Sequence, residues 1–286
     1  MAEATLSTGR PGGRRGVRPR SLEAASAAGP ATITARHVTK TFGHGSIQVT
    51  ALDDVSIDVE EGSFVSLLGP SGCGKSTMMR LIAGLQEPTE GSLEIGNVTP
   101  DDRRRLRDFG IVFQSPVLFD WRTVEENVML PLQIMRWPKA RRRERAQELI
   151  ELVGLKDFAK RYPWQLSGGM QQRVAIARAL TFEPPLLLMD EPFGALDMMT
   201  RERMQTELLS IWAKSAKSTV VFITHSISEA VLLSDRIVVM SARPGRVLKV
   251  IDVDLERPRT EETREIPRYG EIISSIRHLL FSQEQP

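Results

Sequence analysis

The chain has 286 residues, of which 41% are hydrophobic and 26% are charged, with a formal net charge of +2. This length suits one large domain, or one domain with an inserted subdomain. No stretch approaches the ~20 consecutive apolar residues of a membrane-spanning helix, so a soluble or peripheral protein is expected. The single cysteine excludes an internal disulfide framework and suits a reducing compartment.

Arginine is concentrated in residues 1–30, a segment that is otherwise rich in glycine, alanine and proline. Such a composition cannot bury apolar surface, which predicts a disordered basic tail. The rest of the chain is then close to neutral and lacks the basic field that nucleic-acid binding requires. No nucleic-acid partner is therefore expected.

Strand and helix patterns alternate along the chain after this tail. Residues 33–68 read as short strands and turns, ending in the apolar run 64–68, which is typical of a buried parallel strand. Further strands are predicted at 92–95, 109–113, 186–190, 219–224 and 236–240, and helices at 75–85, 174–180 and 199–215. Strands that alternate with helices favour an α/β protein with a mostly parallel sheet and helices on both faces.

Two further helical regions are predicted. Residues 124–181 are mostly helical in pattern, and Thr123 followed by Glu126 is typical of a capping box at the first helix of this region. An inserted helical lobe is therefore expected at about 115–180. Near the C-terminus apolar residues recur at helical spacing, which predicts a docked amphipathic helix. These residues are Tyr269, Ile272, Ile273, Ile276, Leu279 and Leu280.

A glycine-rich segment joins the strand at 64–68 to the helix that follows. Its residues are Gly69, Pro70, Ser71, Gly72, Cys73, Gly74, Lys75, Ser76 and Thr77. The glycines let successive backbone N–H groups point inward and cradle phosphate oxygens, and the helix start adds its positive end. Lys75 supplies a charge for the β- and γ-phosphates, and the Ser76 hydroxyl is a Mg²⁺ ligand. The segment predicts binding of a nucleoside triphosphate. We expect alkylation of Cys73 to block this binding, unless the Cys73 side chain points into the protein and reacts slowly.

The predicted strand at 186–190 ends in two adjacent carboxylates, Asp190 and Glu191. An aspartate at the tip of a buried strand suits Mg²⁺ or its water shell. Glu191 would then reach the γ-phosphate side, where it can orient and deprotonate the attacking water. Acidic residues at strand ends also serve only to cap the next helix, so this pair alone does not decide the function.

A second phosphate-recognising helix start is predicted at Ser167, Gly168 and Gly169, followed by Met170, Gln171, Gln172 and Arg173. Two such starts in one chain are hard to explain with one nucleotide per monomer. They make sense if two copies pair head to tail, so that each nucleotide lies between the phosphate loop of one subunit and the Ser167 segment of the other.

With these motifs in this order, residues 32–245 resemble the ATP-binding cassette (ABC) family. The resemblance implies a phosphate-loop NTPase core, an N-terminal antiparallel β subdomain and an inserted α-helical subdomain. It places the ATPase domain at 31–250 and a C-terminal extension at 251–286. It implies ATP and Mg²⁺ as cofactors and a homodimer in the ATP-bound state.

The resemblance also implies roles for single residues. Phe42 is similar to the aromatic residue that stacks on adenine, with Val49 on the same side. Gln114 resembles the glutamine that joins the Mg²⁺ shell, and His225 the histidine that contacts the γ-phosphate, beside Glu191 and Lys75 as catalytic groups. The Ser167–Gln171 segment resembles the signature that contacts the partner's ATP, and Asp197 lies in the loop that crosses the dimer interface. Ser226 stands where the family often has aspartate.

Within the family, the segments 113–124, 191–197 and 240–246 are most similar to ATPase subunits of nitrate, sulfonate, taurine and pyrimidine-precursor importers. This implies two membrane-spanning permease subunits, a solute-binding protein and a place at the cytoplasmic face of the inner membrane. Leu118, Phe119 and Trp121 are bulky for a loop beside Gln114. They either pack within the helical lobe or form a groove for a cytoplasmic helix of the permease.

Two other functions fit part of the sequence. One is a cassette ATPase that acts on nucleic acid or ribosomes. Such proteins insert long coiled coils before the signature or carry two cassettes, and neither feature is present here. The other is a catalytically silent binding module, against which the presence of Glu191 and His225 argues. Transport is the expectation.

Overall fold

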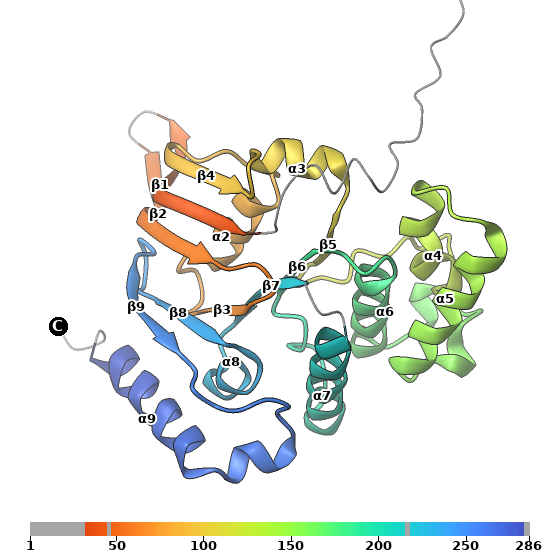
Figure 1. Cartoon of the computed structure of the whole chain (residues 1–286). Coiled ribbons are helices and arrows are strands. Elements are labelled where there is room, and N and C mark those ends of the chain that lie inside the picture. Colours follow the sequence, from red (N-terminus) through yellow and green to blue (C-terminus); the bar gives the residue numbers. More distant parts are fainter. Residues whose placement is uncertain (1–31, 45–46, 215–217, 283–286) are drawn as a thin grey trace, which may run out of the picture.

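The computed structural model describes residues 32–44, 47–214 and 218–282 (Figure 1). The basic tail predicted for residues 1–30 lies outside them. Six strands form the central sheet in the order β5-β6-β7-β3-β8-β9, with parallel pairs except for the antiparallel pair β8 and β9. The strands are β3 (Phe64–Leu68), β5 (Phe109–Val112), β6 (Leu186–Asp190), β7 (Thr219–Thr224), β8 (Arg236–Met240) and β9 (Val247–Asp252). The predicted mostly parallel α/β sheet is confirmed, and β9 is an additional strand.

Both faces of this sheet are buried, as the continuous apolar strands predict. Phe64 and Leu68 of β3 pack on one side, into a core shared with the helices α6 (Gly168–Leu180), α7 (Met198–Lys214) and α8 (Ile227–Leu233). Val65 and Leu67 point to the other side and pack with α2 (Lys75–Ile82) and the small sheet. This alternation follows from the two-residue period of a strand. The phosphate loop therefore starts from a strand that is fixed on both faces.

A second, antiparallel sheet has the order β2-β1-β4 and lies beside α2 (Figure 1). It consists of β1 (Ile33–His44), β2 (Ile47–Val59) and β4 (Glu90–Ile95). The prediction of short strands here was wrong, because β1 and β2 are each continuous. His37 and Asp54 adopt positive φ angles of 51° and 54°, and the pairing shifts register next to them. Such bulges break the apolar alternation that a sequence pattern relies on.

Helices α4 (Val124–Ile134) and α5 (Lys139–Leu152) form a lobe on the opposite side of the molecule from the small sheet (Figure 1). The capping box at Thr123 is confirmed: its side chain accepts a bond from the backbone of Glu126, and the Glu126 side chain accepts one from the Thr123 backbone. Helix α6 begins at Gly168, directly after its N-cap Ser167, where the sequence predicts a helix start. Helix α3 (Pro100–Leu106), before β5, was not predicted.

The C-terminal segment returns to the core through η3 (Glu261–Glu265) and α9 (Pro267–Phe281). Tyr269, Ile272 and Ile276 are buried, and the Tyr269 hydroxyl donates to the carbonyl of Ser228 in α8 at 3.0 Å. The domain boundaries stay a prediction. In the described part of the chain, none of the helices has the length and apolar character to cross a membrane.

Candidate functional site

The phosphate loop lies where β3, at the centre of the sheet, turns into α2. Gly72 and Gly74 have φ angles of 77° and 93°, which side chains rarely tolerate. A Cβ atom at Gly74 would also lie 2.6 Å from the carbonyl oxygen of Ala51 in β2. The Lys75 ammonium, only 5% exposed, donates to the carbonyls of Gly69 at 2.7 Å and Pro70 at 2.9 Å. The loop is thus held open in a curved shape with a cation at its base.

The Cys73 side chain is turned away from the surface of the loop. It is 1% exposed, and its Sγ atom lies 3.7 Å from the Lys75 Nζ. This burial favours the alternative in which the Cys73 side chain points into the protein and reacts slowly. The thiol is directed into the protein, where a Cβ atom at position 69 would lie 3.0 Å from its Sγ atom.

Ser76 and Asp190 come together beside the loop. The Ser76 hydroxyl donates to Oδ1 of Asp190 at 3.1 Å, although the two residues are 114 positions apart. Burial raises the pKa of Asp190, and the bond from Ser76 opposes that shift. A hydroxyl and a carboxylate side by side are oxygen donors of the kind that Mg²⁺ prefers. Among the described residues, no group of three or more His, Cys, Asp or Glu is placed to hold a metal ion.

Three neighbouring parallel strands bring three polar side chains together, and two of them approach one carboxylate oxygen of the third. Glu191 follows β6, Gln114 follows β5 and His225 follows β7. Oε2 of Glu191 lies 3.1 Å from the His225 Nδ1 and 3.5 Å from the Gln114 Nε2. Glu191 has a φ of 45°, a conformation that costs about 1 kcal/mol or more in a residue with a side chain. The backbone is thus strained at the residue expected to act as the base.

Phe42 of β1 is the direct cross-strand partner of Val49 in β2. Both side chains are exposed, at 38% and 41%, and the Lys40 ammonium lies 5.3 Å from the Phe42 ring centre. Val49 is two residues from Ala51, which abuts Gly74 of the phosphate loop. An exposed aromatic ring on this edge offers a surface on which a base can stack.

The Ser167 segment forms a helix start as predicted, with the Ser167 hydroxyl accepting from the backbone N–H of Met170 at 3.3 Å. A Cβ atom at Gly169 would lie 3.2 Å from the carbonyl of Ala195, in the loop that precedes Asp197. Gln171 turns its amide back onto the carbonyls of Pro163 and Leu166. Within the described residues, no hydrogen bond joins this segment to the phosphate loop.

Asp197 caps α7, since its Oδ1 atom accepts the backbone N–H of Thr200 at 3.0 Å, and this bond lowers the pKa of the exposed Asp197. Ser226 likewise caps α8 and accepts the N–H of Glu229 at 3.3 Å. The serine at this position therefore serves the helix as an aspartate would.

The sequence prediction missed two groups of side chains around the site. Gln172 and Arg178 of α6 hold the loop after β5: Gln172 donates to the Phe113 carbonyl at 3.1 Å, and Arg178 donates to the carbonyls of Pro116 and Val117. Buried Glu229 accepts a bond from Thr224, the residue before His225. The spacing of Ser226 and Glu229 resembles a capping box, which was the available signal, but the Glu229 side chain turns to Thr224 instead.

Comparison with known proteins agrees with this geometry. The family model described as "ABC transporter" matches residues 52–194. An uncharacterized ABC transporter ATP-binding protein, MJ0412, of Methanocaldococcus jannaschii is 48% identical over 84% of this chain and 89% of that protein. The taurine import ATP-binding protein TauB of Rhizobium johnstonii is 49% identical over 82% of this chain and 91% of its own length. The aliphatic sulfonates import ATP-binding protein SsuB of Bacillus cereus is 44% identical over 81% and 90%.

Solved structures show the same fold. The ATP-binding cassette MJ0796, in a dimeric post-hydrolysis state bound to ADP and Pi, superposes with a TM-score of 0.72 at 39% identity, covering 77% of this chain and 98% of that one. The chain described here belongs to the ABC transporter family and is an ABC-type ATPase.

Proposed function

We propose that this chain is the ATP-hydrolysing subunit of an importer for a small solute of the taurine or sulfonate type, peripheral to the inner membrane. The observation that carries the proposal is the convergence of Gln114, Glu191 and His225 beside Ser76 and Asp190. The relatives TauB and SsuB are named for import of taurine and aliphatic sulfonates and support the solute class. They also argue against the alternative of a cassette ATPase that acts on nucleic acid.

Each residue of the site then has one task. Lys75 and the loop N–H groups bind the β- and γ-phosphates, and Phe42 with Val49 receives the adenine. Mg²⁺, when bound with ATP, neutralises phosphate charge, and Ser76, Asp190 and Gln114 are the residues that would hold it. Glu191 orients and deprotonates the attacking water, and His225 contacts both Glu191 and the γ-phosphate.

The second half of each ATP site comes from a partner copy of the chain, through Ser167, Gly168 and Gly169. Lys75→Ala and Ser167→Arg should each abolish turnover in a homodimer. A mixed dimer has one Lys75→Ala subunit and one Ser167→Arg subunit and can be purified through two different tags. One of its two ATP sites combines the unaltered phosphate loop of one subunit with the unaltered Ser167 segment of the other, so the mixed dimer should hydrolyse ATP at up to about half the wild-type rate. Activity of the Ser167→Arg homodimer, or no activity in the mixed dimer, would contradict the head-to-tail arrangement.

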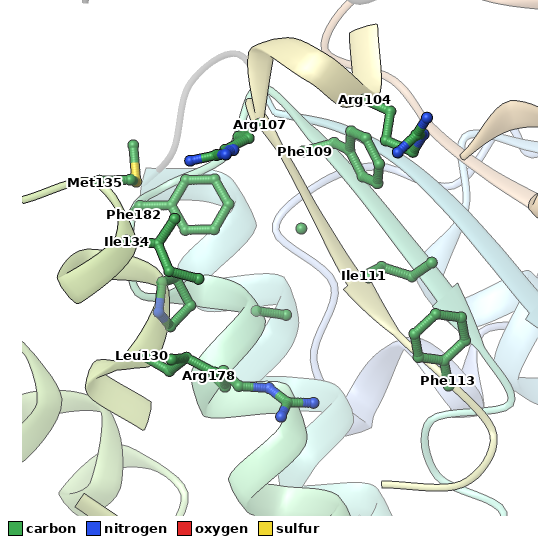
Figure 2. Close-up of a pocket in the computed structure, with 13 residues that line it drawn as sticks. Arg104, Arg107, Phe109, Ile111, Phe113, Leu130, Ile134, Met135, Arg178 and Phe182 are labelled. Atoms are coloured by element: carbon green, nitrogen blue, oxygen red, sulfur yellow. The ribbon is translucent and has the colours of Figure 1, made fainter. Parts of the chain in front are cut away.

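The permease docks at a cavity between β5 and the helical lobe. The cavity has a volume of about 620 Å³. Figure 2 shows Phe109 and Ile111 of β5, with Phe113 just after it, facing Leu130 and Ile134 of α4 across the cavity. Arg104, Arg107 and Arg178 place positive charge at its borders. We infer that a short cytoplasmic helix of the permease, apolar on one side, occupies this cavity.

The cavity is joined to the ATP site by two bonds. Arg178, which lines the cavity, donates to the carbonyls of Pro116 at 3.1 Å and Val117 at 2.8 Å, which lie two and three residues after Gln114. A movement of Gln114 towards bound Mg²⁺ would therefore shift a cavity wall. The loop residues Leu118, Phe119 and Trp121 were expected either to pack within the helical lobe or to form the groove. They do not line this cavity but follow Pro116 and Val117, which Arg178 holds.

A charge inside the cavity tests this assignment. Ile134 is 50% exposed, so Ile134→Glu should fold, bind ATP and dimerise, but should fail to co-purify with the permease. Val250→Glu, at a position 45% exposed on β9 at the other edge of the sheet, is the matched control. Normal co-purification of Ile134→Glu would rule the cavity out as the docking site.

The solute class needs a separate experiment. The ATPase activity of the complex with its permease and a solute-binding protein should be stimulated by taurine or an alkanesulfonate.

A further inference from the structure

A continuous chain of side-chain hydrogen bonds connects the C-terminal segment to the residue that precedes His225. It runs from Arg264 in η3 through Gln205 of α7 and Glu229 of α8 to Thr224 at the end of β7. Three of these four side chains are at most 7% exposed; Arg264 is the outer one, at 28%. None of these four residues contacts the phosphate loop, so the site as described above does not account for them.

The inner end of this chain fixes the backbone on both sides of His225. The Thr224 hydroxyl donates to Oε2 of Glu229 at 2.6 Å and accepts the backbone N–H of Ser226 at 2.9 Å. Thr224 and Ser226 are the two residues adjacent to His225 in the sequence. The His225 side chain itself is 59% exposed and has Glu191 as its partner. Its direction is therefore set by the turn that carries it, and that turn is tied to Glu229.

Glu229 also reaches the loop that precedes Asp197. Its Oε1 atom accepts from the Gln205 amide at 3.3 Å and lies 3.8 Å from Nε of Arg201, whose other nitrogen donates to the Leu196 carbonyl at 3.0 Å. Burial raises the pKa of Glu229, while the bond from Thr224 and the positive charge of Arg201 oppose this shift. A carboxylate in this position is costly for stability, and an apolar residue of similar size is often as stable.

The outer end is held by the C-terminal segment. Arg264 donates from one nitrogen to Oε1 of Gln205 at 2.8 Å and from the other to Oε1 of Glu202 at 3.0 Å. Gln205 thereby has its oxygen committed to Arg264 and its amide nitrogen committed to Glu229. Because the two bonds fix which way the Gln205 amide faces, Arg264 determines that a donor is presented to Glu229.

We propose that Glu229 is a positioning residue for ATP hydrolysis, which sets the turn of His225 through Thr224, and that Arg264 makes the C-terminal segment part of this device. The inference rests on the proposed catalytic role of His225. It adds that residues outside the phosphate loop, in a segment remote from it in the sequence, control how well the histidine engages Glu191 and the γ-phosphate.

Two substitutions interrupt this series of hydrogen bonds while keeping polar side chains at both positions. Glu229→Gln keeps the shape but replaces one acceptor oxygen by a donor NH₂ group, so either Thr224 or Gln205 then faces a donor. It should lower kcat ~10-fold, with the KM for ATP unchanged, since no nucleotide-binding residue is altered. Arg264→Gln, at the partly exposed end, should lower kcat ~3-fold in the same way. Arg268→Gln is the matched control, because Arg268 is also in the C-terminal segment but pairs with Asp254 and Glu271 at the surface.

A double-mutant cycle separates positioning from a merely structural role. If Glu229 acts through His225, Glu229→Gln should lower the single-turnover rate ~10-fold in the wild type and have no further effect in the His225→Ala background. An equal loss in both backgrounds would overturn the inference, as would unchanged kcat in both Glu229→Gln and Arg264→Gln. Full activity of His225→Ala alone would instead overturn the proposed role of His225, and the inference with it.

Discussion

Nδ1 of His225 lies 3.1 Å from Oε2 of Glu191, although the two residues are 34 positions apart and follow different strands. The contact exists because β6 and β7 are adjacent parallel strands whose carboxyl ends meet at one edge of the sheet. It places a titratable imidazole against the carboxylate that we propose as the general base. Two neighbouring strand ends thus carry the two residues to which we assign the hydrolytic step.

Replacing Glu191 should separate binding from hydrolysis. Glu191→Gln keeps the hydrogen-bonding shape but removes the base, so turnover should fall ~10²–10⁴-fold while ATP binding persists. Steady-state phosphate release measures the first effect, and size-exclusion chromatography in ATP should show a trapped dimer. Turnover near the wild-type rate would rule Glu191 out as the base.

Replacing Trp121 should affect the permease contact and not the fold. The Trp121 side chain is 73% exposed, and its ring centre lies 4.9 Å from that of Phe119. Trp121→Ala should therefore change the free energy of unfolding by only about 0.5 kcal/mol. It should weaken co-purification with the permease, because an exposed aromatic anchor typically contributes ~2 kcal/mol to an interface.

Trp164→Ala is the control for that experiment, since Trp164 is 70% exposed in the same lobe and stacks on Tyr162. Its co-purification with the permease should be unchanged. A large loss of thermal stability in Trp121→Ala would show that this residue packs within the lobe instead.

The thiol of Cys73 should react slowly, because its side chain is 1% exposed. Labelling with a maleimide, followed by mass spectrometry, should proceed at the same low rate with and without MgATP, and quickly in urea. Rapid labelling of the native protein that MgATP suppresses would show instead that the thiol opens towards the nucleotide.

The buried pair of Arg103 and Asp108 should make stability depend on pH. The Arg103 Nε lies 3.0 Å from Oδ2 of Asp108, and the two side chains are 1% and 6% exposed. Burial raises the pKa of Asp108, and the Arg103 charge opposes that rise. Arg103→Met should therefore cost about 3 kcal/mol at neutral pH, since it leaves a buried carboxylate without its cation.

The sign of the pH effect follows from the raised pKa. A folded state that holds its proton more tightly than the unfolded state gains stability as the pH falls through the folded pKa. Without Arg103 that pKa rises further, so the cost of Arg103→Met should shrink as the pH is lowered. Urea unfolding between pH 5 and 8 measures this. Adding Asp108→Asn should recover most of the loss and remove its pH dependence, and a cost that is constant with pH would contradict this account.

The sequence by itself determined the phosphate loop, the strands at 186–190, 219–224 and 236–240, and the helix start at Ser167. Each is a local pattern in which backbone geometry dictates the residue type, as glycine does at the positive φ of Gly74. Neighbours along the chain are enough to fix such features. The residues that meet at the site could be named because each one ends such an element.

Only the tertiary structure decided which side chains of those elements touch and which way they face. The burial of the Cys73 thiol, the bonds from Arg178 to the loop after Gln114, and the chain from Arg264 to Thr224 all join segments far apart in the sequence. The long strands β1 and β2 were also missed, because bulges at His37 and Asp54 disrupt the alternation. Such contacts depend on strand order and on packing, and no local sequence pattern encodes either. The energies of burial and of hydrogen-bond pairing are set by neighbours that only the fold brings together.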